Sequence, residues 1–302
     1  MSSLTSANLV FAANKAIIGA RPALAKIGLF ATDFSDEVVQ PGSTIKIQLF
    51  GAGTAETFDA STANYEHNTN SVTQVSITFD KHIKCTYNFT DKDFASDKLT
   101  GSVWDRAGIA GGKDVAKGIL DAVAAQINST NCTGSVSATL GASFSKADLA
   151  KLYSACYELG IDPAETNLVL KPSYYAQMLS LFDAAVYGGV EAVRSGVVPG
   201  LYGFANVICL QPHVTGESTA ATDDFNCALI PANGLVVAGR VVPVDSPSAY
   251  EEIGTQVDEN TGMVLGVRRH GAAATGTNWM TIEGLFGVAV AQGAKCAIVA
   301  AS

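Results

Sequence analysis

The chain has 302 residues and a mass of 31.2 kDa; 48% of its residues are hydrophobic and only 16% are charged. This composition excludes an intrinsically disordered chain, because disorder goes with low hydrophobicity and high charge density. The 28 acidic residues outnumber the 19 basic ones and give a net charge of −9, which argues against a protein that binds nucleic acid by neutralising phosphates. Average proteins are about 25% charged, so the chain must either span a membrane or bury much of its surface against other chains.

A membrane span is not predicted. A spanning helix needs about 20 nearly uninterrupted apolar residues, and the most apolar stretch, residues 285–301, is broken by Gln292, Gly293 and Lys295. The N-terminus has no basic residue ahead of its short apolar run, so we expect no secretory signal. Six cysteines are scattered singly, without a C-x-x-C pair. These features predict a soluble cytosolic chain whose spare apolar surface serves assembly.

The N-terminal third of the chain predicts an arm followed by strands. Residues 1–40 are weakly patterned, and we interpret them as an arm with at most one helix. Alternation of apolar and polar residues predicts strands at residues 44–49, 75–79 and 83–89. The segment between the first two strands, residues 51–74, has three acids and no Lys or Arg.

If its flanking strands pair, the segment at residues 51–74 is a long antiparallel excursion with few large apolar residues. Isolated two-stranded ribbons are marginal in water, so the excursion cannot stabilise itself. Two interpretations stay open: a mobile surface loop, or an element that something outside its own domain stabilises.

The middle of the chain predicts helices. Apolar residues that recur every four positions predict an amphipathic helix over residues 113–128, after a break at Gly111 and Gly112. A capping-box pattern of Ser145 and Asp148 predicts the start of a second helix.

The remainder predicts one more helix and then strands. Pro172 opens a third helix, which follows a short strand at residues 167–170. Later strands are predicted at residues 204–210, 228–231, 234–244, 263–269, 284–291 and 295–300. The order of strands, helices and then strands predicts an α+β fold.

A search for chemistry yields no site. No two of the four histidines lie within i,i+4 reach of each other. His82 lies three residues before Cys85 and His213 four residues after Cys209, but neither pair has a further ligand nearby in the sequence, so we predict no metal site. Residues 108–114 fail as a phosphate loop, because Asp114 stands where a magnesium-binding Ser or Thr is required. No G-x-S-x-G motif occurs, and adjacent acid pairs are interpreted as solvated surface. We therefore predict no catalytic, cofactor-binding or metal site, and no enzyme.

The order of features along the whole chain is more informative than any motif. An arm, a long β-excursion, a hairpin segment at residues 75–82, a long helix, a compact helical insert and terminal strands follow one another. Supporting segments are residues 33–47, 167–174, 200–207, 261–268 and 283–290. This arrangement resembles the tailed-bacteriophage major capsid protein family, whose members have the Hong Kong 97-type coat fold.

The resemblance implies a division of the chain into the parts of that fold. Residues 1–43 would be the N-terminal arm and residues 44–79 the extended loop, which lies across a neighbouring subunit. Residues 80–130 and 228–302 would form the peripheral domain with its spine helix, and 228–302 would return strands to both domains. Residues 131–227 would form the axial domain.

The resemblance also implies a function. The chain would be a major capsid protein that assembles into the hexamers and pentamers of an icosahedral shell around double-stranded DNA, without sequence-specific binding and without a membrane. It would act in the virion after assembly in the host cytoplasm, with a separate scaffolding protein and a portal protein as partners, while decoration proteins stay open. Alternatives are an encapsulin-type nanocompartment shell or, further off, a surface-layer or tail-tube protein.

Intersubunit contacts are predicted from charge within this resemblance. Acids of the extended loop should meet basic groups of a neighbour, and the loop's aromatic residues should add apolar contact. The residues predicted at this interface are Glu56, Phe58, Asp59, Tyr65, Glu66, Lys113, Lys117, Arg268 and Arg269. Residues 51–74 of the loop have no lysine, so we expect no lysine-based cross-link from them.

Overall fold

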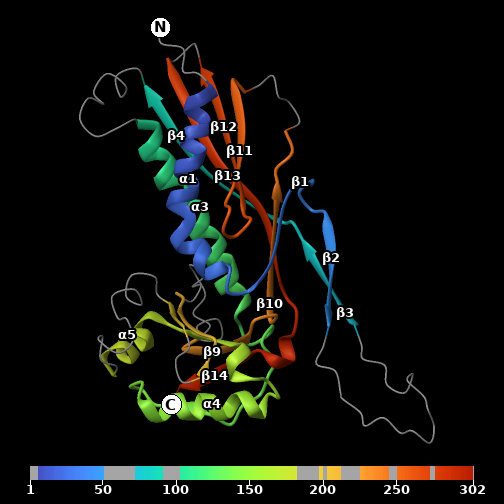
Figure 1. The fold of residues 1–302 in the computed structure, drawn as a ribbon, viewed down its shortest axis with the longest axis vertical. Coiled ribbons are helices and arrows are strands. Elements are labelled where there is room, and N and C mark those ends of the chain that lie inside the picture. The colour runs from blue at the N-terminus through green and yellow to red at the C-terminus, as the bar shows by residue number, and fades with distance from the viewer. Residues whose placement is uncertain are drawn as a thin grey trace, which may run out of the picture.

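The computed structural model describes residues 6–50, 72–90, 103–181, 197–199, 203–211, 225–244, 250–272 and 276–301. Within these ranges the chain forms a large body and a small body, and a two-stranded ribbon leaves the side of the large body (Figure 1). We call residues 127–138, 232–234 and 291–296, which run from one body to the other, the neck.

The helices are α1 (Ser6–Ile27), α3 (Val103–Gln126), α4 (Lys146–Glu158) and α5 (Pro172–Leu181), with short 3-10 helices at Pro163–Glu165 and Gly293–Lys295. The strands are β1 (Ala31–Val38), β2 (Thr44–Phe50), β3 (Val72–Thr78), β4 (Lys81–Thr90), β5 (Thr139–Leu140), β6 (Thr166–Leu170), β7 (Val197–Pro199), β8 (Asn206–Cys209), β9 (Cys227–Pro231), β10 (Leu235–Val241), β11 (Glu252–Val257), β12 (Val264–Ala272), β13 (Thr277–Val290) and β14 (Ala297–Ala301).

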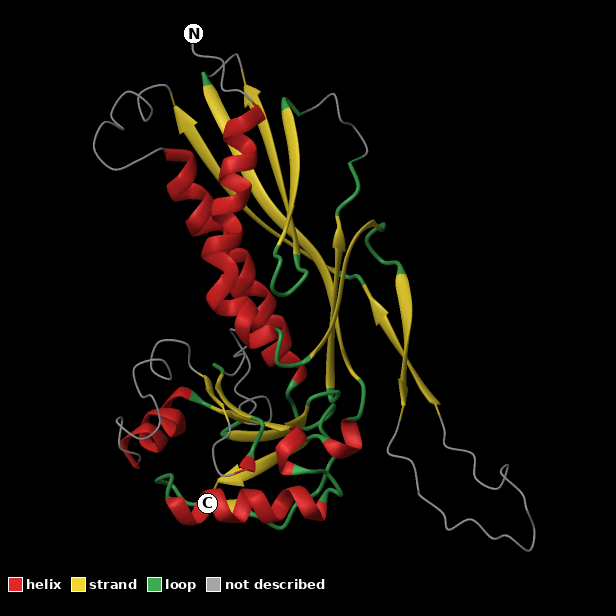
Figure 2. Cartoon of the chain, viewed as in Figure 1, coloured by secondary structure: helices red, strands yellow, loops and turns green. Residues whose placement is uncertain are grey.

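The large body is a sheet with the strand order β1-β10-β13-β12-β11, and β4 also pairs with β13. β13 has 14 residues and runs antiparallel to β10, β12 and β4, so it is the strand on which the sheet is built. Helices α1 and α3 lie side by side along this sheet (Figure 2). Their apolar faces and the sheet share one core, which includes Ile119, Val123, Val267 and Ile282.

The two helices of the large body are in contact through their backbones. A Cβ atom added at Gly112 would lie 2.0 Å from the carbonyl oxygen of Ala16, and one added at Gly19 would lie 2.1 Å from that of Ile109. Such distances are far below van der Waals contact, so glycine is required at both positions. The small side chains let α1 and α3 pack at native density without a gap between them.

The packing of α1 against α3 bears on two predictions, the N-terminal arm and the start of the long helix. The predicted arm at residues 1–43 is largely part of the large body, because α1 packs against α3 and β1 pairs in parallel with β10. The predicted helix at residues 113–128 begins at Val103, ten residues earlier. Gly111 and Gly112 do not break the helix, because both are buried in its interior, where close packing offsets the low helix propensity of glycine.

The small body is a sheet with the strand order β5-β14-β9-β6-β8-β7, and α4 and α5 pack on it. β6 is buried along its whole length. Leu168 and Leu170 pack in the core of α4 and α5, whereas Val169 belongs to the core of the large body. β9 and β14 belong to this sheet, so residues 228–302 contribute strands to both bodies. The predicted α+β class is confirmed.

The predicted start of α4 is confirmed in atomic detail. The hydroxyl and backbone amide of Ser145 both donate to the carboxylate of Asp148, at 2.7 and 2.9 Å, and the Asp148 amide donates back to Ser145 Oγ. Lys151 Nζ lies 3.0 Å from the other carboxylate oxygen. Burial raises the pKa of Asp148, but the bonds from Ser145 and Lys151 outweigh it, so the net pKa lies below its ordinary value.

A pH-dependent stability follows from this cap. Because the folded-state pKa of Asp148 is lowered, its stabilisation is present at neutral pH and is lost as the pH falls below the ordinary carboxyl value of about 3.9. We expect Asp148→Asn to lower the free energy of unfolding by about 1 kcal/mol at pH 7 and by clearly less near pH 3. Urea denaturation at both pH values measures this; an equal loss at both would contradict it.

Candidate functional site

The ribbon is the part of the described structure that leaves the body of the molecule. β2 and β3 pair antiparallel from Thr44 opposite Thr78 to Phe50 opposite Val72, as the alternation predicts. Val75, Ile77 and Phe79 are buried at its base. The predicted contact residues Glu56, Phe58, Asp59, Tyr65 and Glu66 lie outside the described residues.

Arg240 holds the base of the ribbon to the large body. Its guanidinium donates to the backbone oxygen of Asp33 at 2.7 Å, to the Asp33 carboxylate at 3.0 Å and to the backbone oxygen of Gly239 at 2.9 Å. It also lies 5.5 Å from the centroid of the Phe79 ring. Arg240 is only 7% exposed. One side chain therefore joins β1, β10 and the end of β3, and it fixes the direction in which the ribbon leaves.

We expect Arg240→Lys to loosen this joint, because an ammonium keeps the charge but lacks the planar fork of donors. The lost bonds correspond to about 1–2 kcal/mol, so the Phe79 amide, which donates to Ser43, should exchange its hydrogen about tenfold faster. Hydrogen exchange with mass spectrometry measures this. Lys81→Met, which removes only an exposed pair with Asp80, is the control. Unchanged exchange in Arg240→Lys would refute the role.

The two predicted lysines of the spine helix lie on its exposed face. Lys113 and Lys117 are one helical turn apart on α3 and both are exposed. Neither forms an ion pair or a side-chain hydrogen bond with another described residue, so both ammonium groups face solvent in the single chain. The spacing presents two positive charges on one face.

Arg268, in contrast, already has partners inside the chain. Its guanidinium donates to the buried carboxylate of Glu283, to the Tyr250 hydroxyl at 3.4 Å and to the backbone oxygen of Pro243 at 3.2 Å. The second carboxylate oxygen of Glu283 lies 2.9 Å from Nε2 of His82. The side chain of Arg268 is 10% exposed and that of Glu283 is 5% exposed. The predicted contact residue therefore connects β12, β13 and β4.

Arg269 has a similar arrangement on the neighbouring position of β12. It lies 2.9 Å from a carboxylate oxygen of Glu251 and 3.5 Å from one of Glu252. Its guanidinium stands over the ring of Trp104 at 5.6 Å from the centroid. These contacts tie the edge strand β11 and the start of α3 to the sheet, so Arg269 supports the large body whatever else it contacts.

Sequence reasoning missed Arg240 and Glu283. Both are charged residues inside strands that otherwise read as apolar, residues 235–241 and 277–290. A charge in such a strand needs a buried partner, and that signal was available. Their partners Asp33 and His82 lie about 200 residues away along the chain, and nothing local identifies them.

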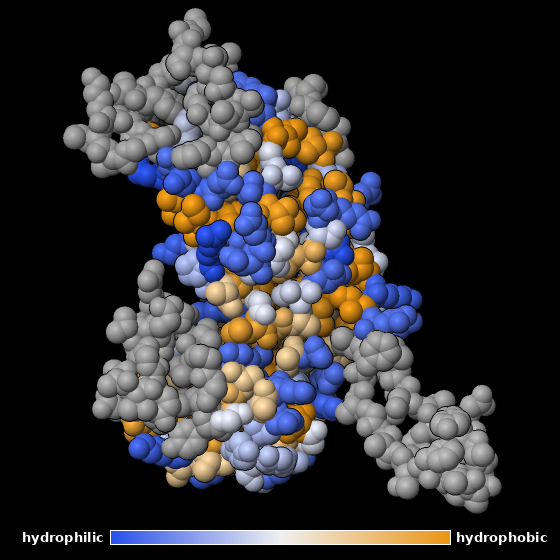
Figure 3. All heavy atoms as spheres, viewed as in Figure 1, coloured by the Kyte–Doolittle hydropathy of each residue, from blue (hydrophilic) through white to orange (hydrophobic). Residues whose placement is uncertain are grey.

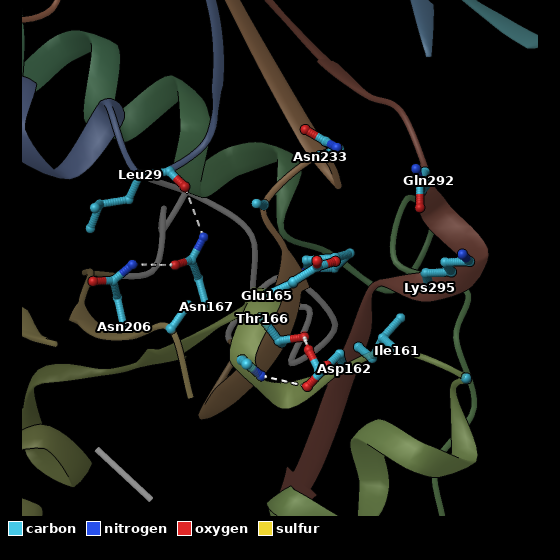
Figure 4. Close-up of a pocket in the computed structure, with 15 residues that line it drawn as sticks. Leu29, Ile161, Asp162, Glu165, Thr166, Asn167, Asn206, Asn233, Gln292 and Lys295 are labelled. Carbon is cyan, nitrogen blue, oxygen red and sulfur yellow. Dashed lines mark hydrogen bonds between the residues drawn. The ribbon is translucent and has the colours of Figure 1, made fainter. Parts of the chain in front are cut away.

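An open polar pocket of about 710 Å³ lies at the neck, between the small body and the end of α1 (Figure 4). Asn167 crosses this junction, because its amide donates to the Leu29 backbone oxygen at 2.8 Å and accepts from Asn206 at 2.9 Å. The lining also contains the carboxylates of Asp162 and Glu165. Among the described residues that line it there is no Ser, Cys or His, and the hydroxyl of Thr166 donates to the Asp162 backbone oxygen at 2.7 Å. The pocket therefore offers hydrogen-bonding groups and charge.

Exposed apolar side chains are spread over several surfaces of the molecule. Hydrophobic patches alternate with hydrophilic ones over the face in Figure 3. The large exposed residues lie on α1, α3, α4, β11 and the end of β1, and they are Ile18, Ile109, Tyr153, Tyr157, Ile253, Val257 and Val38. Several separate surfaces therefore have apolar groups to bury.

Membrane spans and metal sites are two further features that bear on function. Among the described residues, no helix combines the length and the apolar character that a membrane crossing requires. Nowhere in the described part of the chain do three or more His, Cys, Asp or Glu side chains gather as metal ligands would.

Comparison with known proteins gives matches in structure only. No family model and no curated protein matches the sequence. The capsid of the cyanophage P-SCSP1u is similar with a TM-score of 0.55 and 14% identity over 91% of this chain and 86% of that chain. The capsid of a native GTA particle is similar with a TM-score of 0.52 and 13% identity, covering 93% and 91%. A virus-like particle from Pyrococcus furiosus has a TM-score of 0.50 and 10% identity, covering 95% and 97%.

These likenesses extend over about nine tenths of both chains. They confirm the resemblance that the order of sequence features indicated, at the level of the fold. The chain has the Hong Kong 97-type coat fold.

Proposed function

We propose that the chain is a coat subunit that assembles with copies of itself into a closed shell. The observation that carries this proposal is the fold, shared with capsid structures over about nine tenths of the chain. In its full form, the proposal is a major capsid protein of a tailed bacteriophage, whose hexamers and pentamers enclose double-stranded DNA. A separate scaffolding protein and a portal protein would take part in assembly.

The distribution of apolar groups supports self-assembly. A shell subunit contacts neighbours on several flanks, and apolar side chains are exposed here on both helices of the large body, on its edge strand and on α4. Obligate interfaces commonly bury about 2,000–5,000 Å². The low charged fraction of 16% suits a chain that exposes only part of its surface after assembly.

The ribbon supports a specific contact with a neighbour. Its base is held by Ile77, Phe79 and the Arg240 joint, and within the described part of the chain its two strands pair with each other and with no further strand. Because such a ribbon is marginal by itself, we propose that residues 44–79 lie across an adjacent subunit.

We further propose that the acids of this loop, Glu56, Asp59 and Glu66, meet Lys113 and Lys117 of the neighbour. Exposed ion pairs contribute about 0–1 kcal/mol each, so these pairs would set the register of the contact while apolar burial supplies most of its strength. Arg268 and Arg269 would contribute less than the lysines, because their charges are already paired within the chain.

A charge swap tests the lysine contact. Glu56→Lys with Glu66→Lys should reduce the yield of assembled particles, and adding Lys113→Glu with Lys117→Glu should restore it, because opposite charges face each other again. Sedimentation at low and high salt measures the yield. As a control, Lys84→Glu reverses an exposed charge on β4, outside residues 44–79 and outside the predicted contact. Full assembly of the loop variant would refute this pairing.

The function itself is tested by expressing the chain alone and with a candidate scaffolding protein, followed by negative-stain electron microscopy. Closed icosahedral particles are the expected result. Flat sheets or tubes would instead support a surface-layer or tail-tube protein, and a chain that stays monomeric under both conditions would refute the proposal.

An encapsulin-type compartment is the second candidate, because the likeness to the Pyrococcus furiosus virus-like particle covers 95% of the chain. Both candidates predict shells, so the content of particles from the native source separates them. Genome-length DNA supports the phage shell, and an enclosed enzyme supports the compartment.

A further inference from the structure

The neck is held together by direct hydrogen bonds between its three segments. Thr133 N donates to the Gly293 oxygen and Gly134 N to the Cys296 oxygen, both at 2.9 Å. Ala291 N donates to the Gly234 oxygen at 2.8 Å. Every described chain segment that runs between the two bodies therefore takes part in one small bonded cluster, and the relative position of the bodies depends on it.

Two cysteine side chains meet inside this cluster. Cys132, in the first neck segment, is 4% exposed, and Cys296, at the end of the third, is fully buried. The backbone bond from Gly134 N to the Cys296 oxygen at 2.9 Å places the two residues side by side, with their thiols within reach of each other. On its other side the Cys296 sulfur packs against Gly234 of the middle segment. A Cβ atom added at Gly234 would lie only 2.7 Å from this sulfur. All six cysteines are free thiols.

The two thiols are not equivalent. The hydrogen bond from Cys296 lowers the pKa of Cys132, and it outweighs the effect of burial. The same bond, together with burial, raises the pKa of Cys296. The thiolate is the reactive form of cysteine. Cys132 is therefore the nucleophile of the pair, and Cys296 is the resolving thiol.

We propose that Cys132 and Cys296 are an oxidation site that forms a disulfide across the neck when the chain meets a peroxide. In the first step the Cys132 sulfur attacks one oxygen of hydrogen peroxide, the O–O bond breaks, and the leaving hydroxide takes a proton to become water. Cys132 is thereby oxidised to a sulfenic acid.

In the second step the Cys296 sulfur loses its proton and attacks the Cys132 sulfur. The S–O bond breaks and hydroxide leaves as a second water. In total, two thiols and one hydrogen peroxide give one disulfide and two waters. Hydrogen peroxide is small, which suits a pair that is nearly excluded from solvent.

The bond would fix the two bodies relative to each other. It closes a loop from Cys132 to Cys296, which spans more than half of the chain, and long loops gain most from cross-linking. If the proposed shell function holds, the pair would stay reduced in a reducing cytoplasm and close after release into oxidising surroundings. The subunit would then be adjustable during assembly and rigid in the finished shell.

The experiment uses the full chain as unassembled subunits, so its result does not depend on whether shells form. After hydrogen peroxide treatment, the chain is denatured and alkylated, and its intact mass is measured. We expect four alkylated cysteines instead of six, and six again after reduction. Trypsin cleaves after Lys117, Lys146 and Lys295, so the bond should appear as fragment 118–146 joined to fragment 296–302.

Two alanine variants make the test specific. Cys132→Ala should abolish the joined fragment. The control Cys156→Ala removes a fully buried cysteine outside the pair, whose pKa burial raises to about 12, and it should leave the fragment intact. Oxidation should raise the Tm of the wild type and of the control by about 5 °C, but not that of Cys132→Ala.

Six alkylated cysteines after peroxide treatment would overturn the proposal. So would a bond between another pair of cysteines, or oxidation of Cys132 to a sulfinic acid without a link to Cys296.

Discussion

Replacing Gly112 by alanine should lower the free energy of unfolding of the unassembled subunit by about 2–4 kcal/mol. The added methyl group would lie 2.0 Å from the carbonyl oxygen of Ala16, an atom of a helix backbone that cannot rotate away. Helices α1 and α3 would have to separate, and their shared core would open. Helix propensity alone predicts the opposite sign, because alanine is favoured over glycine by about 1 kcal/mol.

Gly118→Ala is the matched control on the same helix. A Cβ at Gly118 would lie 2.7 Å from Cδ1 of Ile83, the far end of a flexible side chain that can move. We expect this variant to be within about 1 kcal/mol of the wild type. Urea denaturation followed by circular dichroism compares the two. If Gly112→Ala is as stable as Gly118→Ala, the backbone contact does not constrain the helices.

The elements predicted correctly are those whose signal is local. The cap of α4 depends on Ser145 and Asp148, three residues apart, and the ribbon strands depend on alternation within seven residues. Both patterns report backbone geometry and side-chain direction directly. They needed no knowledge of the rest of the chain.

The errors arise where a distant segment decides the outcome. The buried face of α1 consists largely of small residues such as Ala12, Ala16 and Ala20, which give a weak hydrophobic pattern, and Pro22 lies inside the helix. The glycines of α3 look like a break until α1 is packed against them. Only the tertiary contact identifies both features as one interface.

The candidate site was predictable in outline and not in detail. The ribbon and the exposed lysines follow from periodicity, but the pairing of Arg268 with Glu283 depends on the register of β12 against β13, and His82 is placed by β4. A dipeptide of two arginines reads as a docking surface in the sequence. In the fold, the sheet brings a carboxylate to each of them. Both arginines therefore support the single chain, and their docking role stays a prediction.

The second large effect on the free energy of unfolding is expected at the ion pair of Arg268 and Glu283. Glu283→Gln should lower the free energy of unfolding by about 3–5 kcal/mol, because the Arg268 guanidinium would remain buried without a counter-charge. Glu283→Leu combined with Arg268→Met should recover most of that loss, since removing both charges leaves no charged group to desolvate. A double-mutant cycle with Glu283→Leu and Arg268→Met as the single variants measures the coupling. A double variant as unstable as the sum of the single ones would show that the pair is not coupled.

The double variant Glu283→Leu with Arg268→Met also distinguishes a role of Arg268 in the stability of the subunit from a role in assembly. If Arg268 acts only within the chain, as its contacts with Glu283, Tyr250 and Pro243 indicate, a stable double variant should form particles in wild-type yield. A variant that folds normally and fails to form particles would place Arg268 at the interface as well. Because folding and particle yield are measured on the same protein, the prediction of a docking role for Arg268 can be tested without the ambiguity of a destabilised subunit.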